Sequence, residues 1–304
     1  LGVFVDLVGL PSLLGLLERE QRRFAVIGNV AFHVIIGCAG VALLAQPPVA
    51  FDRVPGSDGL GERLLIARDG GVWAVTDGSA RFVTTDGVGP PTGYSGSLPW
   101  SGGWDERHGL WVLADKEDAV YFRPEDTWER WPRATGLSQH GAMWRGQAYA
   151  RIGGALWTSP GPGADWHQLQ IDGTVTDVSA TRDGVWAAGT RVWFAEDGAT
   201  FRDATPAGYS ALRAEVVGGY VFTGSLFSCS LWAPDGPRPC PVRDARVLAV
   251  EPTDGTPQLW LGSWGQGVWY SPDGGQTWVD YGGRGLEVRQ LAVDWPNRRV
   301  WFST

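Results

Sequence analysis

Histidine, cysteine and lysine are scarce in this sequence, and their scarcity excludes several kinds of site. The 304 residues include four histidines, three cysteines and a single lysine, Lys116. Neither C-x-x-C nor H-x-x-x-H spacing occurs, so the sequence predicts no metal site. A phosphate-binding glycine loop and a G-x-S-x-G nucleophile motif are also missing, and no catalytic residues are assigned.

Positive charge is scarce as well. Asp and Glu outnumber Lys and Arg by 33 to 25, which gives a formal net charge of -8. Binding of nucleic acid needs a basic surface that neutralises phosphates, so this class of partner is excluded. By contrast, the chain has 44 glycines, 18 tryptophans and an apolar content of 43%. This composition excludes a disordered chain and is typical of an all-β protein with short aromatic strands and tight turns.

One long uncharged segment stands near the start of the sequence. Residues 24–45 carry no charged side chain, and as a helix they would extend roughly 33 Å, enough for the ~30 Å hydrocarbon core of a bilayer. A secretory signal peptide is the alternative, but the run is longer than the apolar region of such peptides. We therefore expect an interfacial segment that contacts lipid over 1–23, a transmembrane helix over 24–46, a linker over 47–59 and a folded domain over 60–304.

Arginines and cysteines both bear on the side of the membrane where this domain lies. The arginines that precede the apolar run are Arg19, Arg22 and Arg23, and the positive-inside rule then favours a periplasmic domain over a cytoplasmic one. Cys229 and Cys240 flank a turn, so adjacent strands could join them in a disulfide, which suits an oxidising compartment. Two buried thiols are an equally supported alternative.

Polar and small residues form a stripe on the predicted transmembrane helix. Asn29, His33 and Gly37 lie at i, i+4 and i+8, with Gly40 nearby, so they share one face. In lipid such a face usually marks a contact between helices, and we expect it to pack against another transmembrane segment. A sharper alternative is that the His33 imidazole ligates the magnesium of a chlorophyll.

A repeat of about 38 residues dominates the sequence after residue 60. Short β-type runs recur at intervals of 35 to 41 residues, with centres at Trp73, Trp111, Tyr149, Trp186, Val221, Trp260 and Trp301. A weaker strand precedes each centre, and a second run follows each of the first six. Units of this length predict the blades of a β-propeller. Six complete units and part of a seventh favour seven blades over six, and residues 49–54 are expected to close the ring with an outer strand.

One turn motif in the repeats is specific. The segment SPDGGQTW, residues 271–278, matches the Asp-box pattern S-x-D-x-G-x-T-W at every fixed position: Ser271, Asp273, Gly275, Thr277 and Trp278. Degenerate copies stand in register at 159–166 and 195–201. Side chains of this motif can bond the backbone of their own hairpin while the aromatic packs inward, so we interpret it as a structural element.

On these residues, the chain resembles the Asp-box propellers, a group that includes sialidases and the photosystem II stability and assembly factor family. The stretch from Gly262 to Thr304 looks most like the latter family, and a propeller with one membrane span is similar to an accessory subunit of bacterial reaction-centre–antenna supercomplexes. The resemblance implies a non-catalytic subunit in a bacterial photosynthetic membrane, with reaction-centre or antenna proteins as partners and bacteriochlorophyll nearby.

Two other functions stay open on the sequence. A carbohydrate-binding or sialidase-like propeller would need convergent arginines, a Tyr–Glu pair and an acidic residue, and the nearest approach to its early motif is the segment 121–126. A transient assembly factor would associate with intermediates only.

Overall fold

The computed structural model describes residues 51–57, 64–68, 70–97, 99–114, 119–123, 127–132, 140–161, 164–211, 214–225, 228–253 and 255–304. Within these ranges we find no helix that is long and apolar enough to cross a membrane. The chain divides into two compact units, Leu1–Val49 and Ala50–Thr304. The helix predicted over 24–46 and the segment 1–23 lie outside the described residues, so both stay predictions.

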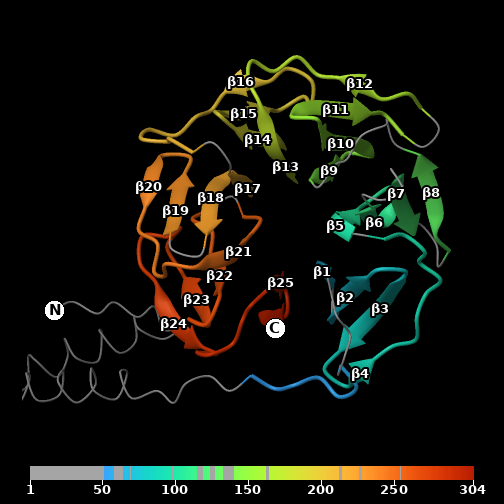
Figure 1. Ribbon diagram of the computed structural model, residues 1–304, viewed down its shortest axis with the longest axis vertical. Helices are drawn as coiled ribbons and strands as arrows, with labels where there is room; N and C mark the ends of the chain where they lie inside the picture. The colour runs from blue at the N-terminus through green and yellow to red at the C-terminus, as the bar shows by residue number, and fades with distance from the viewer. Residues whose placement is uncertain are drawn as a thin grey trace, which may run out of the picture. The chain divides into compact units, whose positions relative to one another are not determined.

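The second unit is an all-β propeller. Its described strands form seven antiparallel sheets placed around a central opening (Figure 1). The first three sheets are β1 (Leu64–Arg68), β2 (Gly71–Thr76), β3 (Ser79–Thr84) and β4 (Gly87–Val88); β5 (Pro99–Asp105), β6 (Gly109–Ala114), β7 (Ala119–Arg123) and β8 (Glu129–Pro132); and β9 (Gly141–Trp144), β10 (Gln147–Ile152), β11 (Ala155–Ser159) and β12 (His167–Gln168).

The remaining four sheets continue the same order. They are β13 (Val175–Thr181), β14 (Gly184–Gly189), β15 (Val192–Ala195) and β16 (Arg202–Asp203); β17 (Glu215–Val217), β18 (Tyr220–Ser225), β19 (Ser228–Ala233) and β20 (Gly236–Arg238); β21 (Ala245–Val250), β22 (Leu259–Ser263), β23 (Val268–Ser271) and β24 (Val279–Gly282); and the pair β25 (Gln290–Asp294) and β26 (Arg299–Ser303).

The sequence repeat coincides with the sheets. Each of the seven repeat centres lies on the second strand of one sheet, from Trp73 on β2 to Trp301 on β26. The turn between the first and second strands of the third sheet is short: Arg145 and Gly146, with φ of 50° and 79°, form a two-residue loop between β9 and β10. Positive φ at both positions is the geometry of the tight hairpin turns that twisted strands prefer. The backbone conformation of this turn therefore matches the antiparallel pairing of the two strands that it joins.

The core lies between neighbouring sheets. Trp111 and Leu113 of β6, Trp131 of β8 and Met143 of β9 form one cluster that joins the second and third sheets, and each of these side chains is less than 9% exposed. Similar clusters fill the other boundaries, such as Trp260 with Leu291 between the sixth and seventh sheets. Large aromatic side chains thus fill the space between neighbouring sheets. They are buried because both sheets cover them, which neither sheet could do alone.

The ring closes without an outer strand from the described N-terminal residues. Each first strand contacts the first strand of the next sheet, and β25 contacts β1. Residues 51–54 are not a strand, so within the described residues the expected outer strand over 49–54 is wrong. Instead the Phe51 ring packs against Phe302 of β26, 4.8 Å between centroids. Burial of this aromatic ring, in place of ladder hydrogen bonds, attaches the segment to the last sheet.

Two buried aspartates hold adjacent sheets together. Asp105 on β5 accepts a hydrogen bond from the Gly146 backbone N–H of the next sheet, at 3.2 Å. Asp294 on β25 accepts one from the Gly70 N–H of the first sheet, at 3.1 Å. The boundary that closes the ring is therefore held by the same kind of bond as an internal boundary, and charge-assisted bonds of this type are among the stronger ones.

Candidate functional site

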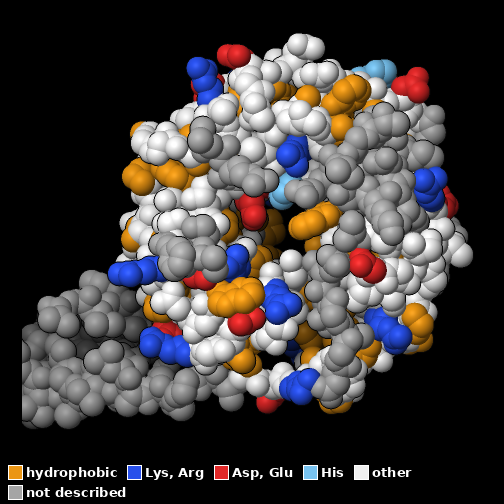
Figure 2. Space-filling model, viewed as in Figure 1, with side chains coloured by type: hydrophobic (Ala, Val, Ile, Leu, Met, Phe, Trp, Pro, Cys, Tyr) orange, Lys and Arg blue, Asp and Glu red, His pale blue; other side chains and the backbone are white. Residues whose placement is uncertain are grey.

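The propeller has two faces, which are distinguished by strand direction. The first strand of each sheet begins at one face of the propeller, and the second strand ends there; we call this the top face. The bottom face is the opposite one. Acidic, basic, histidine and hydrophobic side chains border the central opening in the view of Figure 2. Two groups of top-face residues combine charge with incomplete burial.

The first group, the channel-mouth cluster, consists of His140, Asp177 and Glu215. His140 immediately precedes β9, Asp177 lies near the start of β13, and Glu215 begins β17, so each comes from a different sheet. The Asp177 carboxylate lies 2.8 Å from Nδ1 of His140 through Oδ1, and its Oδ2 accepts the Val216 N–H at 2.6 Å. Asp177 therefore links three consecutive sheets at the central opening.

Electrostatics make this cluster sensitive to protonation near neutral pH. Glu215 reaches solvent but is surrounded by protein atoms on most sides, and burial, followed by the negative charge of Asp177, raises its pKa to about 7. Burial lowers the pKa of His140, but its hydrogen bond with Asp177 and the charges of Asp177 and Glu215 outweigh that effect and raise the pKa above 6.5. The cluster thus retains protons over the range in which free Glu and His side chains lose them.

Replacement of Glu215 by glutamine is expected to flatten the dependence of stability on pH. A raised pKa in the folded state contributes stability that is present below the ordinary pKa of 4.5 and is lost as pH rises through about 7. Because solvent screens Glu215, we expect the loss to be only about 1 kcal/mol between pH 5 and 8. Urea unfolding at pH 5, 6, 7 and 8 measures it, and equal pH slopes in the parent and variant proteins would contradict the assignment.

The second group, the Trp264 cluster, consists of Asp244, Arg246, Trp264, Glu287 and Arg289. Trp264 follows β22 and is 38% exposed. The guanidinium carbon of Arg246 lies 4.9 Å from the centroid of its ring and that of Arg289 lies 5.7 Å away. Both distances are within the range of cation–π attraction.

Backbone and carboxylate contacts fix this cluster. The Trp264 N–H donates to the Asp244 carbonyl at 3.0 Å, and Trp264 forms a β-bridge with Glu287. The Asp244 carboxylate pairs with Arg246 Nε at 2.9 Å, and the Glu287 carboxylate with Arg289 Nη2 at 3.4 Å. The pair with Asp244 thus helps to hold Arg246 beside the indole, whereas the contact between Arg289 and Glu287 is longer and more exposed.

The hairpin 271–278 has the internal hydrogen bonds that its sequence predicts. The Asp273 carboxylate accepts the Thr277 N–H at 2.8 Å and the Thr277 hydroxyl at 2.6 Å. Ser271 Oγ donates to Asp273 and accepts the Gly275 N–H at 2.8 Å. Burial raises the pKa of Asp273, but the bonds from Thr277 and Ser271 outweigh this effect and lower it. All of these contacts stay inside one turn, which is the geometry of a structural element.

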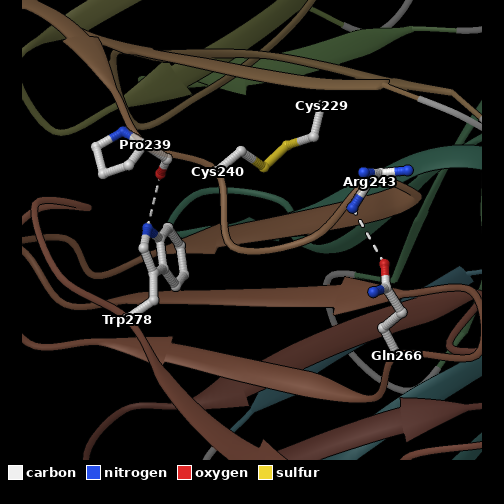
Figure 3. The surroundings of a disulfide bond; sticks show 6 residues. All are labelled: Cys229, Pro239, Cys240, Arg243, Gln266 and Trp278. Carbon is white, nitrogen blue, oxygen red and sulfur yellow. Dashed lines mark hydrogen bonds between the residues drawn. A yellow bond between two sulfur atoms is a disulfide. The ribbon is translucent and has the colours of Figure 1, made fainter.

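Cys229 and Cys240 form a disulfide, with 5.9 Å between their Cα atoms (Figure 3). Of the two alternatives left open by the sequence, the structure has the disulfide. The predicted contact face of Asn29, His33, Gly37 and Gly40 lies outside the described residues, as does any role of His33 as a chlorophyll ligand. Those assignments stay predictions.

Sequence reasoning missed both top-face groups. His140, Asp177 and Glu215 recur at spacings of 37 and 38 residues, the period of the repeat, so polar residues at equivalent positions of successive units were a detectable signal. Trp264 had no such signal, because its arginines lie far apart in the sequence, Arg246 on β21 and Arg289 just before β25. Among the described residues no group of three or more His, Cys, Asp or Glu side chains could hold a metal ion.

No family model and no curated protein matches the sequence. Solved structures do match. The extracellular domain of the one component system BT4673 from B. thetaiotaomicron is 11% identical with a TM-score of 0.59 over 85% of this chain, which spans only 39% of that one. Streptogramin B lyase is 10% identical with a TM-score of 0.60 over 80% of this chain and 90% of its own. YCF48 bound to D1 peptide is 14% identical with a TM-score of 0.58 over 85% and 94%. At these identities the similarity shows the propeller fold alone.

Proposed function

We propose that this chain is a non-catalytic accessory subunit that stabilises a membrane protein complex, and that its top face docks on the partner through the Trp264 cluster. In this proposal each sheet is one blade of a seven-bladed Asp-box propeller, and the helix 24–46 anchors the propeller on the periplasmic side of a bacterial photosynthetic membrane. The partners are reaction-centre and light-harvesting proteins.

The arrangement of Trp264 with Arg246 and Arg289 carries the docking proposal. Trp and Arg are the residues that most often contribute large binding energies at protein interfaces. Here Arg246 already pairs with Asp244 at 2.9 Å and Arg289 contacts Glu287 at 3.4 Å, so part of the side-chain ordering precedes binding. A partly exposed indole that contacts two guanidinium groups is therefore a suitable anchor for a partner surface.

Three further observations support the rest of the proposal. The uncharged run 24–45 is long enough for a span, and Asn29 and His33 give it a polar face. The Cys229–Cys240 disulfide suits an oxidising compartment. One solved neighbour, YCF48, was captured with a D1 peptide, which is an example of a propeller of similar fold that binds a peptide.

Purification in mild detergent through a tag on this chain tests the function. Near-stoichiometric recovery of reaction-centre or antenna subunits in mass spectrometry, together with bacteriochlorophyll absorption bands, is the expected result. Recovery only with immature intermediates would indicate an assembly factor instead. A colourless chain without partners would contradict the proposal and favour a carbohydrate-binding propeller, which glycan screening would then examine.

Alanine at Trp264 is expected to reduce recovery of the partner by roughly tenfold, because an interface anchor of this kind contributes more than 1 kcal/mol. Trp104 is a matched control: it is 43% exposed and its ring carries Arg68 at 3.4 Å, but it lies at the end of β5, on the bottom face. Trp104→Ala should leave recovery unchanged. Equal losses in the two variants would place the docking surface elsewhere.

A further inference from the structure

The Cys229–Cys240 disulfide anchors the segment that connects the fifth and sixth sheets. Cys229 lies on β19, and Cys240 follows the end of β20 by two residues, where the chain turns from the outer strand toward β21. Figure 3 shows a second anchor beside it, the hydrogen bond from the Trp278 indole N–H to the Pro239 carbonyl, 2.9 Å long. Both cysteines are partly exposed and pack at the edge of a core cluster.

The connecting segment, residues 241–244, leads directly into the Trp264 cluster. Its Arg243 N–H donates to the Gln266 side-chain oxygen at 3.1 Å, a contact also visible in Figure 3. Its last residue, Asp244, accepts the Trp264 N–H and pairs with Arg246. Only three residues separate Cys240 from Asp244, and a residue spans at most ~3.6 Å. A displacement of Cys240 is therefore transmitted to the residues that support Trp264.

We propose that this disulfide is a site of thiol–disulfide exchange with a dithiol protein, and that its reduction loosens residues 241–244 and weakens docking at the Trp264 cluster. The proposed effect of reduction on docking rests on the proposed function. The exchange site itself rests on the partly exposed disulfide and its chain connection to Asp244.

The chemistry needs one dithiol reductant. A thiolate of that reductant attacks one protein sulfur, the Cys229–Cys240 bond breaks, and a mixed disulfide forms. The second thiol of the reductant then displaces the protein cysteine, so the reductant becomes a disulfide. The protein gains two electrons and two protons and ends with two thiols. After this step the Trp278–Pro239 and Arg243–Gln266 hydrogen bonds remain at the connecting segment.

Hydrogen–deuterium exchange on the full-length chain in detergent tests the inference, with dithiothreitol as the dithiol. The mass of a peptide that contains Cys229 and Cys240 should first rise by two hydrogen atoms, which confirms reduction. We then expect amide exchange over 241–246 and 262–267 to accelerate at least tenfold, while a peptide over 141–152 in the third sheet stays unchanged. The Cys229→Ser/Cys240→Ser variant should show the accelerated pattern without reductant.

Two controls keep the test decisive. Trp278→Phe removes the indole donor but keeps the covalent link, so its exchange over 241–246 should stay within twofold of the parent. Unchanged exchange after confirmed reduction would overturn the inference, and so would a uniform acceleration around the ring, which would mean a general loss of stability. Partner recovery is measured separately. Equal recovery with oxidised and with reduced protein would overturn the proposed effect of reduction on docking. No recovery with the oxidised protein would contradict the proposed function alone.

Discussion

Replacement of Asp177 by alanine is expected to lower the free energy of unfolding by about 3 kcal/mol. The carboxylate is 6% exposed and accepts hydrogen bonds from Val216 and His140 of the two neighbouring sheets. Its removal leaves the Val216 N–H without its acceptor at a buried position. Denaturant unfolding of the full-length chain, followed by tryptophan fluorescence, measures the loss, which corresponds to roughly 6–12 °C in Tm for a domain of this size.

Asp183 supplies the comparison for this variant. Its side chain is 72% exposed and pairs only loosely with Arg182, at 3.7 Å, so Asp183→Ala should change stability by less than about 0.5 kcal/mol. Asp177→Asn keeps an acceptor for Val216 and should recover part of the loss. If Asp177→Ala proved as mild as Asp183→Ala, the bond between sheets would not be a determinant of stability.

Replacement of Gly189 by alanine is expected to be similarly damaging, at about 3 kcal/mol. A Cβ at Gly189 would overlap the backbone carbonyl oxygen of Thr174 and lie 2.8 Å from its carbon, and neither atom can rotate away. Gly189 pairs with Val175 beside the bulge that positions Asp177, so the strain would fall on the register of β13 and β14.

Gly161→Ala is the matched control for this substitution. Among the described residues no atom lies within 4 Å of a Cβ built there, and its φ is not in the left-handed region. We expect its unfolding free energy to match that of the parent within about 0.5 kcal/mol. Circular dichroism melting curves of the two variants compare them directly. Similar Tm values for both would show that the backbone at Gly189 adapts to a side chain.

The propeller architecture could be predicted from the sequence because it depends on patterns of residues that lie close together in the chain. Trp73, Trp111 and Trp260 mark second strands, and the spacing between such residues equals one sheet of four short strands. The hairpin around Asp273 was predictable for the same reason, since its donors and acceptors lie within eight residues of one another. Interactions between residues that are close in sequence can therefore be predicted from a sequence motif.

The top-face groups depend on contacts between sheets, and these are not visible in one dimension. Asp177 and His140 meet only because β9 and β13 lie side by side at the central opening. Arg246 and Arg289 come from either side of β22, and only the fold places both over Trp264. The expected outer strand failed on similar grounds, because burial of the Phe51 ring, rather than strand pairing, attaches residues 51–54 to the last sheet.

Closure of the ring between β25 and β1 also determines the order in which the propeller forms. Within each sheet the strands are neighbours in sequence, so they can pair early and with little loop-closure entropy. Contact between β25 and β1 joins opposite ends of the domain, and the Asp294–Gly70 bond joins residues 224 positions apart, which carries a high loop-closure entropy. We therefore expect this boundary to be absent from the folding transition state. Its strength then determines how slowly the native ring opens and has little effect on how fast the ring folds.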